Sequence, residues 1–319
     1  MTIETRIKSM NSAMKALFLA TGMLSVSAAM AAAAPNVVVS IKPIHSLVAS
    51  IMHGVAEPAV LIEGAASPHT YQMKPSDAST LQNADIVFWV GHDLEKFMEK
   101  PLSTLGSGAR IVELDEAPGL LKLPTRESGT FEPHADDGPH VEGEEEEVDL
   151  HLWLNTDNAK AMARMIEKTL VEDDPANTQA YEKNLVNLEA RLDTLAADIK
   201  ATVAPVKDKP FIVFHDAYQY FEKEFGVNVA GSITVTPENL PGAARIAEIH
   251  DKVKSLKSTC VFAEPQFEPK LITVVLEGTN ARTGTLDPEA GALTKGEALY
   301  SDMMMGIATS LRDCLSAAG

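Results

Sequence analysis

The 319-residue sequence has little cysteine and a shortage of positive charge. Cys260 and Cys314 are its only two cysteines, and it contains no CxxC or HExxH pattern, so these short motifs of metal and redox chemistry are absent. It has 27 Lys and Arg residues against 45 Asp and Glu residues, giving a net charge of −18. This balance argues against nucleic acid as a partner and favours cations.

The N-terminus has the pattern of an export signal. Arg6, Lys8 and Lys15 precede an uncharged run that begins at Ala16 and ends in small residues. A membrane anchor is the alternative, but no basic segment follows to stop transfer. We expect residues 1–33 to be a cleaved signal peptide. Because this segment has no cysteine for lipid attachment, we expect an exported protein without a lipid anchor.

The remaining sequence alternates apolar, strand-like runs with amphipathic stretches, which predicts α/β structure with parallel sheets. The alternation covers residues 34–173 and resumes over 206–319, so we predict two α/β lobes. Residues 174–205 are predicted to form one long helix that joins the lobes, because no helix breaker occurs between Pro175 and Pro205. Its apolar residues recur at intervals of three and four: Tyr181, Leu185, Leu188, Leu192, Leu195 and Ile199.

An acidic stretch interrupts the first lobe. Residues 131–151 hold nine acidic side chains and no Lys or Arg. The stretch is too polar to be buried, so we predict that 131–149 form a surface loop. Its histidines, His134 and His140, are predicted to be auxiliary ligands that catch metal ions and pass them inward.

Three histidines stand where strands are predicted to end: His69, His151 and His215. Ligands of parallel α/β structures gather at the carboxyl ends of strands, which favours a metal site. The alternatives are a turn position for His69 and a buried, hydrogen-bonded ring for His151. If the segment around His151 is extended, His151 shares a face with Trp153 and Asn155. Asp216 is expected either to cap the next helix or to orient the ring of His215.

Four segments carry a resemblance to a known family: "HLWL" (151–154), "FHDAYQYFEKEFG" (214–226), "CVFAEPQF" (260–267) and "GTLDP" (284–288). They resemble the periplasmic zinc-binding components of ABC transporters in the cluster A-I solute-binding family. The resemblance spans the chain after the signal peptide. It implies two α/β lobes joined by one long rigid helix, with the metal in the cleft between the lobes.

Carried over by motif, the resemblance implies that His69, His151 and His215 bind Zn²⁺. It also matches Cys260 and Cys314 to a disulfide, which an even pair in an oxidising compartment favours over two buried thiols. Some family members carry Glu before the first ligand histidine, whereas this chain has Pro68. Water is therefore the first candidate for the fourth ligand, followed by Asp287 of "TLDP" or a loop histidine.

The predicted function is capture of Zn²⁺ and its delivery to a membrane permease driven by a cytoplasmic ATPase. A periplasmic metallochaperone is a further candidate partner, and the protein is expected to be a monomer and not an enzyme. Zinc affinity is expected to fall as the pH drops through about 6.5, because protons compete for the imidazoles. The rival interpretations are a manganese or other divalent-metal carrier and a zinc hydrolase or lyase. For an enzyme, Glu264 and Asp216 are the candidate general bases.

Overall fold

The structure is a computed structural model in which residues 34–319 form one compact unit. The predicted signal peptide, apart from Ala33, lies outside the residues that can be described, as do His134 and His140. The described residues are 33–126, 131, 147–234, 237, 241–256, 259–268 and 270–317.

The first half of the chain forms a parallel four-stranded sheet in the order β2-β1-β3-β4. Residues of β1 and β3 are buried throughout, which explains why these strands read as uninterrupted apolar runs. The elements of this half are β1 (Val37–Val39), α2 (Lys42–Ile51), β2 (Ala59–Val60), α3 (Pro75–Gln82), β3 (Ile86–Trp89), α4 (Glu99–Thr104) and β4 (Arg110–Glu113).

The second half repeats this arrangement with a parallel sheet in the order β6-β5-β7-β8. Two α/β lobes with the same strand order confirm the predicted fold class. The elements are β5 (Pro210–His215), α7 (Gln219–Phe225), β6 (Asn228–Thr234), α8 (Ala243–Ser255), β7 (Cys260–Ala263), α9 (Lys270–Leu276) and β8 (Arg282–Thr285).

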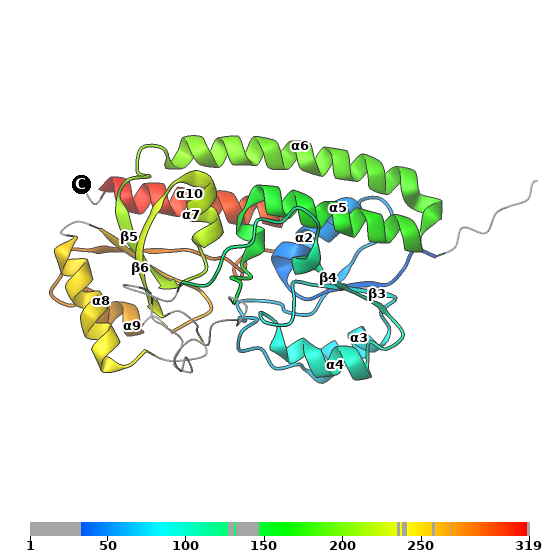
Figure 1. The fold of residues 1–319 in the computed structure, drawn as a ribbon, viewed down its shortest axis with the longest axis horizontal. Coiled ribbons are helices and arrows are strands. Elements are labelled where there is room, and N and C mark those ends of the chain that lie inside the picture. Colours follow the sequence, from blue (N-terminus) through cyan, green and yellow to red (C-terminus); the bar gives the residue numbers. More distant parts are fainter. Residues whose placement is uncertain are drawn as a thin grey trace, which may run out of the picture. The chain divides into compact units, whose positions relative to one another are not determined.

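Helices α5 (Thr156–Asp173) and α6 (Thr178–Val203) connect the two sheets in sequence. Asn155 caps α5 by accepting a hydrogen bond from the backbone N–H of Asn158. Helix α6 is the long helix that the sequence predicts, and Figure 1 shows it running past both sheets. Its predicted apolar row is buried, except that Leu185 is half-buried.

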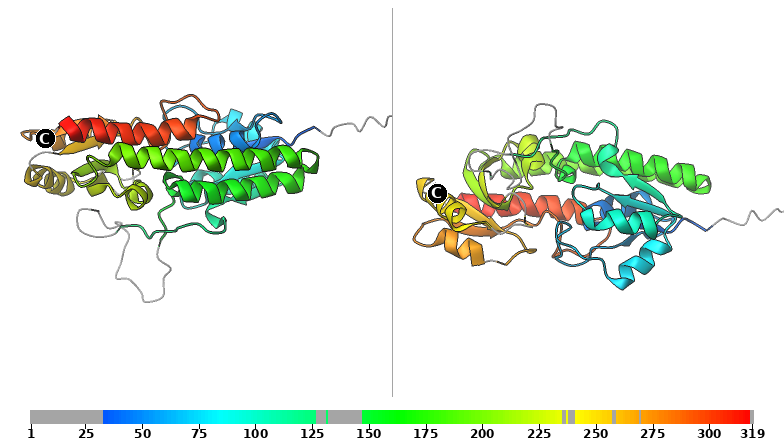
Figure 2. Two further views of the ribbon diagram at one scale, coloured as in Figure 1. Left: turned by 90° about the horizontal axis from the view of Figure 1, so that it is seen from above. Right: turned by 60° about the horizontal axis from the view of Figure 1, so that its bottom comes forward.

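The last helix, α10 (Leu299–Ala317), also connects the two halves. It contacts α6 along its length, α2 in the first half and β8 in the second, and lies beside α6 in Figure 2. Helix α10 therefore spans the two halves in addition to the predicted long helix, α6. A disulfide between Cys260 and Cys314 fastens α10 to β7, as predicted. Within the part of the chain that the structure describes, no helix is both long and apolar enough to cross a membrane.

Candidate metal centre

His69 lies in the loop between β2 and α3, and its side chain is half-buried. The chain that follows His69 is held by Asp77 in the first turn of α3. Asp77 Oδ2 accepts hydrogen bonds from the Tyr71 hydroxyl at 2.6 Å and from the Lys74 N–H at 2.8 Å. Burial of the hydroxyl and its hydrogen bond to the Asp77 carboxylate both favour the protonated form, so the pKa of Tyr71 is raised. These hydrogen bonds fix the backbone that follows His69 and so help to position its side chain.

His151 is buried, and its ring is oriented by Asp149. Asp149 Oδ1 accepts a hydrogen bond from the ring Nδ1 at 2.7 Å and another from the His151 backbone N–H at 3.0 Å. Asp149 Oδ2 accepts a third from Gln219 Nε2 at 3.2 Å. Because this carboxylate holds the ring proton on Nδ1, Nε2 of His151 is unprotonated and its lone pair points away from Asp149.

The segment after His151 is not extended. Residues Leu152–Leu154 form a turn of 3₁₀ helix that leads into α5, so the expectation of a shared face for His151, Trp153 and Asn155 is wrong. Hydrogen-bond acceptors at both ends favour the turn, since Asp149 receives the His151 N–H and Asn155 caps α5. Trp153 is instead buried, with its Nε1 donating to Pro288 O at 2.9 Å.

His215 is the last residue of β5, where the sequence predicts the strand to end. The register that sets Phe211 beside Cys260 brings His215 level with Glu264, just past β7. His215 Nδ1 and Glu264 Oε2 are 2.6 Å apart, and Tyr218 donates to Glu264 Oε1 at 3.3 Å. Burial raises the pKa of Glu264 to about 8, because the apolar surroundings disfavour its charge.

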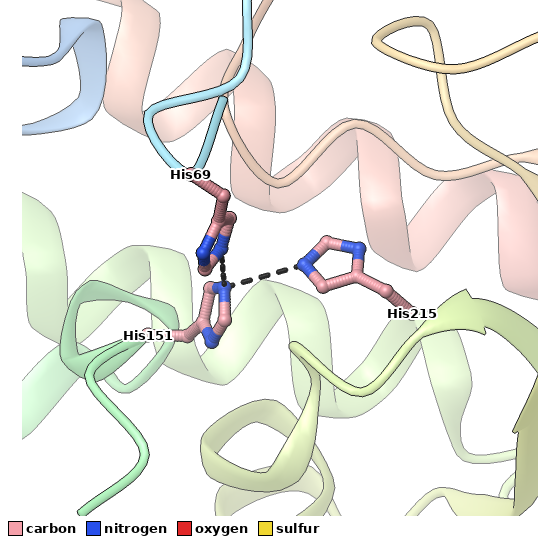
Figure 3. A group of neighbouring side chains, drawn as sticks. All are labelled: His69, His151 and His215. Carbon is pink, nitrogen blue, oxygen red and sulfur yellow. Dashed lines mark hydrogen bonds between the residues drawn. The ribbon is translucent and has the colours of Figure 1, made fainter. Parts of the chain in front are cut away.

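The three histidines converge through their Nε2 atoms (Figure 3). His151 Nε2 lies 3.3 Å from Nε2 of His69 and 3.3 Å from Nε2 of His215. Nitrogens bound at about 2.0–2.1 Å to a tetrahedral zinc ion are themselves about 3.3–3.4 Å apart. The two distances therefore match two edges of such a tetrahedron. One potential ligand atom from each of the three side chains lies within 4.8 Å of the others.

The hydrogen-bonding capacity of His151 also favours a cation. Its Nε2 has one lone pair, which can accept one well-directed hydrogen bond, yet two imidazole nitrogens lie 3.3 Å from it. A cation shared by the three nitrogens would interact favourably with all three lone pairs. The site is buried beside the carboxylate of Asp149, which would partly balance the charge of a divalent ion.

Asp216 has neither of the roles expected from the sequence. The N-cap of α7 is Tyr218, and the ring of His215 is held by Glu264. Asp216 is buried and forms a two-point ion pair with Arg126, whose Nε lies 2.9 Å from Asp216 Oδ2. Burial raises the pKa of Asp216, and the Arg126 guanidinium opposes that rise. Asp216 therefore anchors the chain segment that contains Arg126.

Asp287 is not part of the convergent group. Among the residues that the structure describes, the cluster able to hold a metal ion consists of His69, His151 and His215. Asp287 Oδ1 accepts hydrogen bonds from Gln266 Nε2 at 2.8 Å and Gly291 N–H at 2.9 Å. Its Oδ2 accepts from Ala292 N–H at 3.0 Å. As a fourth ligand, Asp287 stays a prediction.

Comparison with known proteins places the chain in a family. The family model described as "Zinc-uptake complex component A periplasmic" (ZnuA) matches residues 37–314. The chain belongs to the ZnuA family. This result confirms the resemblance found in the four sequence segments.

The ZnuA family includes curated relatives that align over most of the chain. The high-affinity zinc uptake system protein ZnuA of Brucella suis is 48% identical, over 94% of this chain and 98% of the relative. The protein of the same name from Yersinia pestis is 36% identical, over 89% of this chain and 92% of the relative.

Solved structures with the ZnuA fold also match. One titled "Crystal structure of ZnuA" is 26% identical, with a TM-score of 0.73 over 88% of this chain and 99% of that chain. A periplasmic zinc-binding protein from Treponema pallidum also has a TM-score of 0.73, over 88% of this chain and 99% of its own. It is 20% identical, so this second likeness concerns the fold alone.

Sequence reasoning on this ZnuA family member missed the roles of two carboxylates. Asp149 had a local signal, since an acid two residues before a histidine can cap its backbone and reach its ring. Glu264 was noted only as a general-base candidate. Its place beside His215 follows from the pairing of β5 with β7, because the carboxyl ends of neighbouring parallel strands meet at one edge of the sheet.

Proposed function

We propose that this protein binds one Zn²⁺ ion through His69, His151 and His215 and delivers it to the permease of an ABC transporter. Water is proposed as the fourth ligand. One observation supports this proposal above all: Nε2 atoms from three distant parts of the chain converge, and the two 3.3 Å distances from His151 Nε2 to the others fit a tetrahedral ion. The family model's description and the relatives' names, which specify zinc uptake, agree with it.

The choice of zinc over manganese follows from the ligand type. Imidazole nitrogens suit zinc, copper and nickel, whereas manganese prefers carboxylates and water. The carboxylates of Asp149 and Glu264 face the Nδ1 atoms, on the opposite side of each ring from Nε2. They orient the rings and are not placed as ligands.

Binding, and not catalysis, is the role that these contacts favour. A zinc hydrolase or lyase needs a general base within hydrogen-bond reach of zinc-bound water. Both candidates are engaged elsewhere, because Glu264 pairs with His215 Nδ1 and Asp216 pairs with Arg126. The ZnuA family is a family of transport proteins, and we propose that this member is a carrier without enzymatic activity.

The cellular setting is proposed on the same basis. The family description is periplasmic, and we propose that residues 1–33 are a signal peptide removed on export, without a lipid anchor. The protein would then act as a monomer that docks on a permease with a cytoplasmic ATPase, and a periplasmic metallochaperone is a further proposed partner.

The test is a calorimetric titration of the metal-free mature protein with Zn²⁺ and with Mn²⁺. We expect one tight zinc site and weaker manganese binding. Replacement of His215 by Ala should remove most of the zinc affinity. His92→Ala is the matched control, since the His92 side chain is 59% exposed and lies outside the cluster. Equal zinc affinity of His215→Ala and the wild type would exclude His215 from the site.

The proposed auxiliary role of His134 and His140 needs a separate deletion. Removing residues 132–146 should leave the tight site intact and abolish additional weak binding. The segments on either side are paired, with Pro124 bridging Val148 and Thr125 N–H donating to Glu147 O at 2.8 Å. Loss of tight binding in the deletion variant would show that the acidic stretch supplies a primary ligand.

A further inference from the structure

The segment Asp287–Leu293, which follows β8, contacts parts of the chain next to all three histidines. In sequence it belongs to the second half of the chain, together with His215. Its contacts include residues of the first half and the turn after His151. Its shape therefore bears on how the three imidazoles are placed relative to one another.

The Asp287 carboxylate determines the shape of this segment. It receives the backbone N–H groups of Gly291 and Ala292, four and five residues downstream, at 2.9 and 3.0 Å. Gln266 Nε2 adds a third hydrogen bond at 2.8 Å. Gln266 stands two residues after Glu264, which holds the ring of His215. Asp287 thus connects the folded segment to the chain that orients His215.

The same segment is bound to the turn after His151 and to α2. Pro288 O accepts a hydrogen bond at 2.9 Å from Nε1 of Trp153, two residues after His151. The ammonium group of Lys42, a buried residue at the start of α2, donates to Gly291 O at 2.9 Å and to Leu293 O at 3.2 Å. Lys42 can donate to both carbonyl oxygens at once only while the segment Asp287–Leu293 keeps this fold.

Gly291 brings the segment against the loop that carries His69. A Cβ atom placed on Gly291 would lie 2.9 Å from Ala65 Cα and 3.0 Å from Ala65 Cβ, which is too close. Ala65 stands four residues before His69 in the same loop. A larger residue at position 291 would therefore push on the backbone that positions His69.

We propose that Asp287 is a positioning residue for the zinc site. Its hydrogen bonds keep Asp287–Leu293 folded as a brace, and this brace fixes the positions of His69 and His151 relative to His215. Asp287 does not bind the ion in this proposal, and its three hydrogen bonds are kept when zinc is present. The fourth ligand is then an exchangeable water molecule. This inference rests on the proposed binding of zinc by the three histidines.

The first experiment changes the brace without touching a ligand or a charge. Gly291→Ala should lower the zinc affinity about 10-fold or more, as loss of an outer support around a metal site typically does. Gly108→Ala is the control, because a Cβ there meets nothing within 4 Å, and its affinity should match the wild type. Circular dichroism and the melting temperature of the metal-free variants confirm that each one folds.

The second experiment separates positioning by Asp287 from ligation by Asp287. Asp287→Asn keeps an oxygen that accepts the Gly291 N–H, whereas Asp287→Ala keeps none. Under the proposal the zinc affinity of the Asn variant lies between those of wild type and the Ala variant. If Asp287 is a ligand, both variants lose the carboxylate and their affinities fall alike.

The third experiment tests the fourth ligand position with azide added to the Co²⁺-loaded protein. An exchangeable water predicts that azide changes the visible absorption of the wild type. If azide acts only after Asp287 is replaced, Asp287 is a ligand and the proposal fails. Wild-type zinc affinity in Gly291→Ala also overturns it, while the proposed function stands. Absence of tight zinc binding in the wild type itself would instead contradict the proposed function.

Discussion

Each imidazole has two ring nitrogens, and at His151 and His215 one of them faces a buried carboxylate. Asp149 and Glu264 fix the ring planes and turn Nε2 of both histidines to a common point. The carboxylate of Asp149 also supplies negative charge beside a site for a cation. At the scale of single residues, the site therefore consists of two pairs of a ring and a carboxyl group, together with the ring of His69.

Replacing Asp149 by Ala should lower the zinc affinity about 10- to 100-fold, because the ring of His151 loses its orienting acceptor. A competition titration with a zinc chelator measures the change. Asp157→Ala is the control, since that side chain is 82% exposed at the start of α5. If Asp149→Ala binds zinc as tightly as this control, the carboxylate does not orient His151.

Some residues of the site can be predicted from the sequence, and others cannot. His69, His151 and His215 could be selected because each follows an apolar run, and a strand end can be recognised locally. The partnership of Glu264 with His215 depends on which strands are neighbours and on their register, which local pattern does not specify. The hydrogen bonds of Asp287 depend on the folded path of its own loop and could not be read from "TLDP".

At the scale of single elements, the end of β3 depends on one buried acid. Glu95 Oε2 accepts hydrogen bonds from the N–H groups of Val90 at 2.7 Å and Gly91 at 3.1 Å, which follow the strand. Glu95 is fully buried, and this burial raises its pKa to about 7 from an ordinary value of 4.5. The folded protein thus retains a proton that the unfolded chain releases at lower pH.

This difference predicts a pH dependence of stability. Because the pKa of Glu95 is higher in the folded state, its contribution is complete below pH 4.5 and is lost as the pH rises through about 7. Glu95→Gln cannot ionise and keeps an acceptor for both N–H groups. Denaturant unfolding of the metal-free proteins should therefore show a smaller loss of stability between pH 5 and pH 8 in the variant. Equal losses would contradict the prediction.

The elements themselves were largely predictable. Buried parallel strands are apolar on both faces, so their runs stand out in the sequence, and α6 showed its buried face through residues such as Leu188 and Leu192. The turn at Leu152–Leu154 was missed because its alternating apolar residues imitate a strand. Side-chain capping by Asp149 and Asn155 overrode that pattern.

At the scale of the whole described unit, α6 and α10 lie side by side and each contacts both halves of the chain. The disulfide between Cys260 and Cys314 joins α10 to the second sheet across 54 residues of sequence. This bond restricts the unfolded chain and lies outside the cluster of histidines.

Replacing both cysteines by Ser should lower the free energy of unfolding by about 4 kcal/mol, the loop-closure value for a loop of this length. Guanidinium unfolding of the oxidised wild type and the double variant measures the difference. Zinc affinity at a temperature where both proteins are folded should change little. An unchanged unfolding midpoint would show that the disulfide adds nothing to stability.

Two helices that pack against each other bend less easily than either helix would alone. In this protein such a pair spans the two halves that supply the three histidines, and two of the distances between their Nε2 atoms already match edges of a tetrahedron. Little of the binding free energy would then be needed to draw the two halves together, which favours tight binding of the ion. Under the proposed function, release of the ion would require the permease to separate these nitrogen atoms.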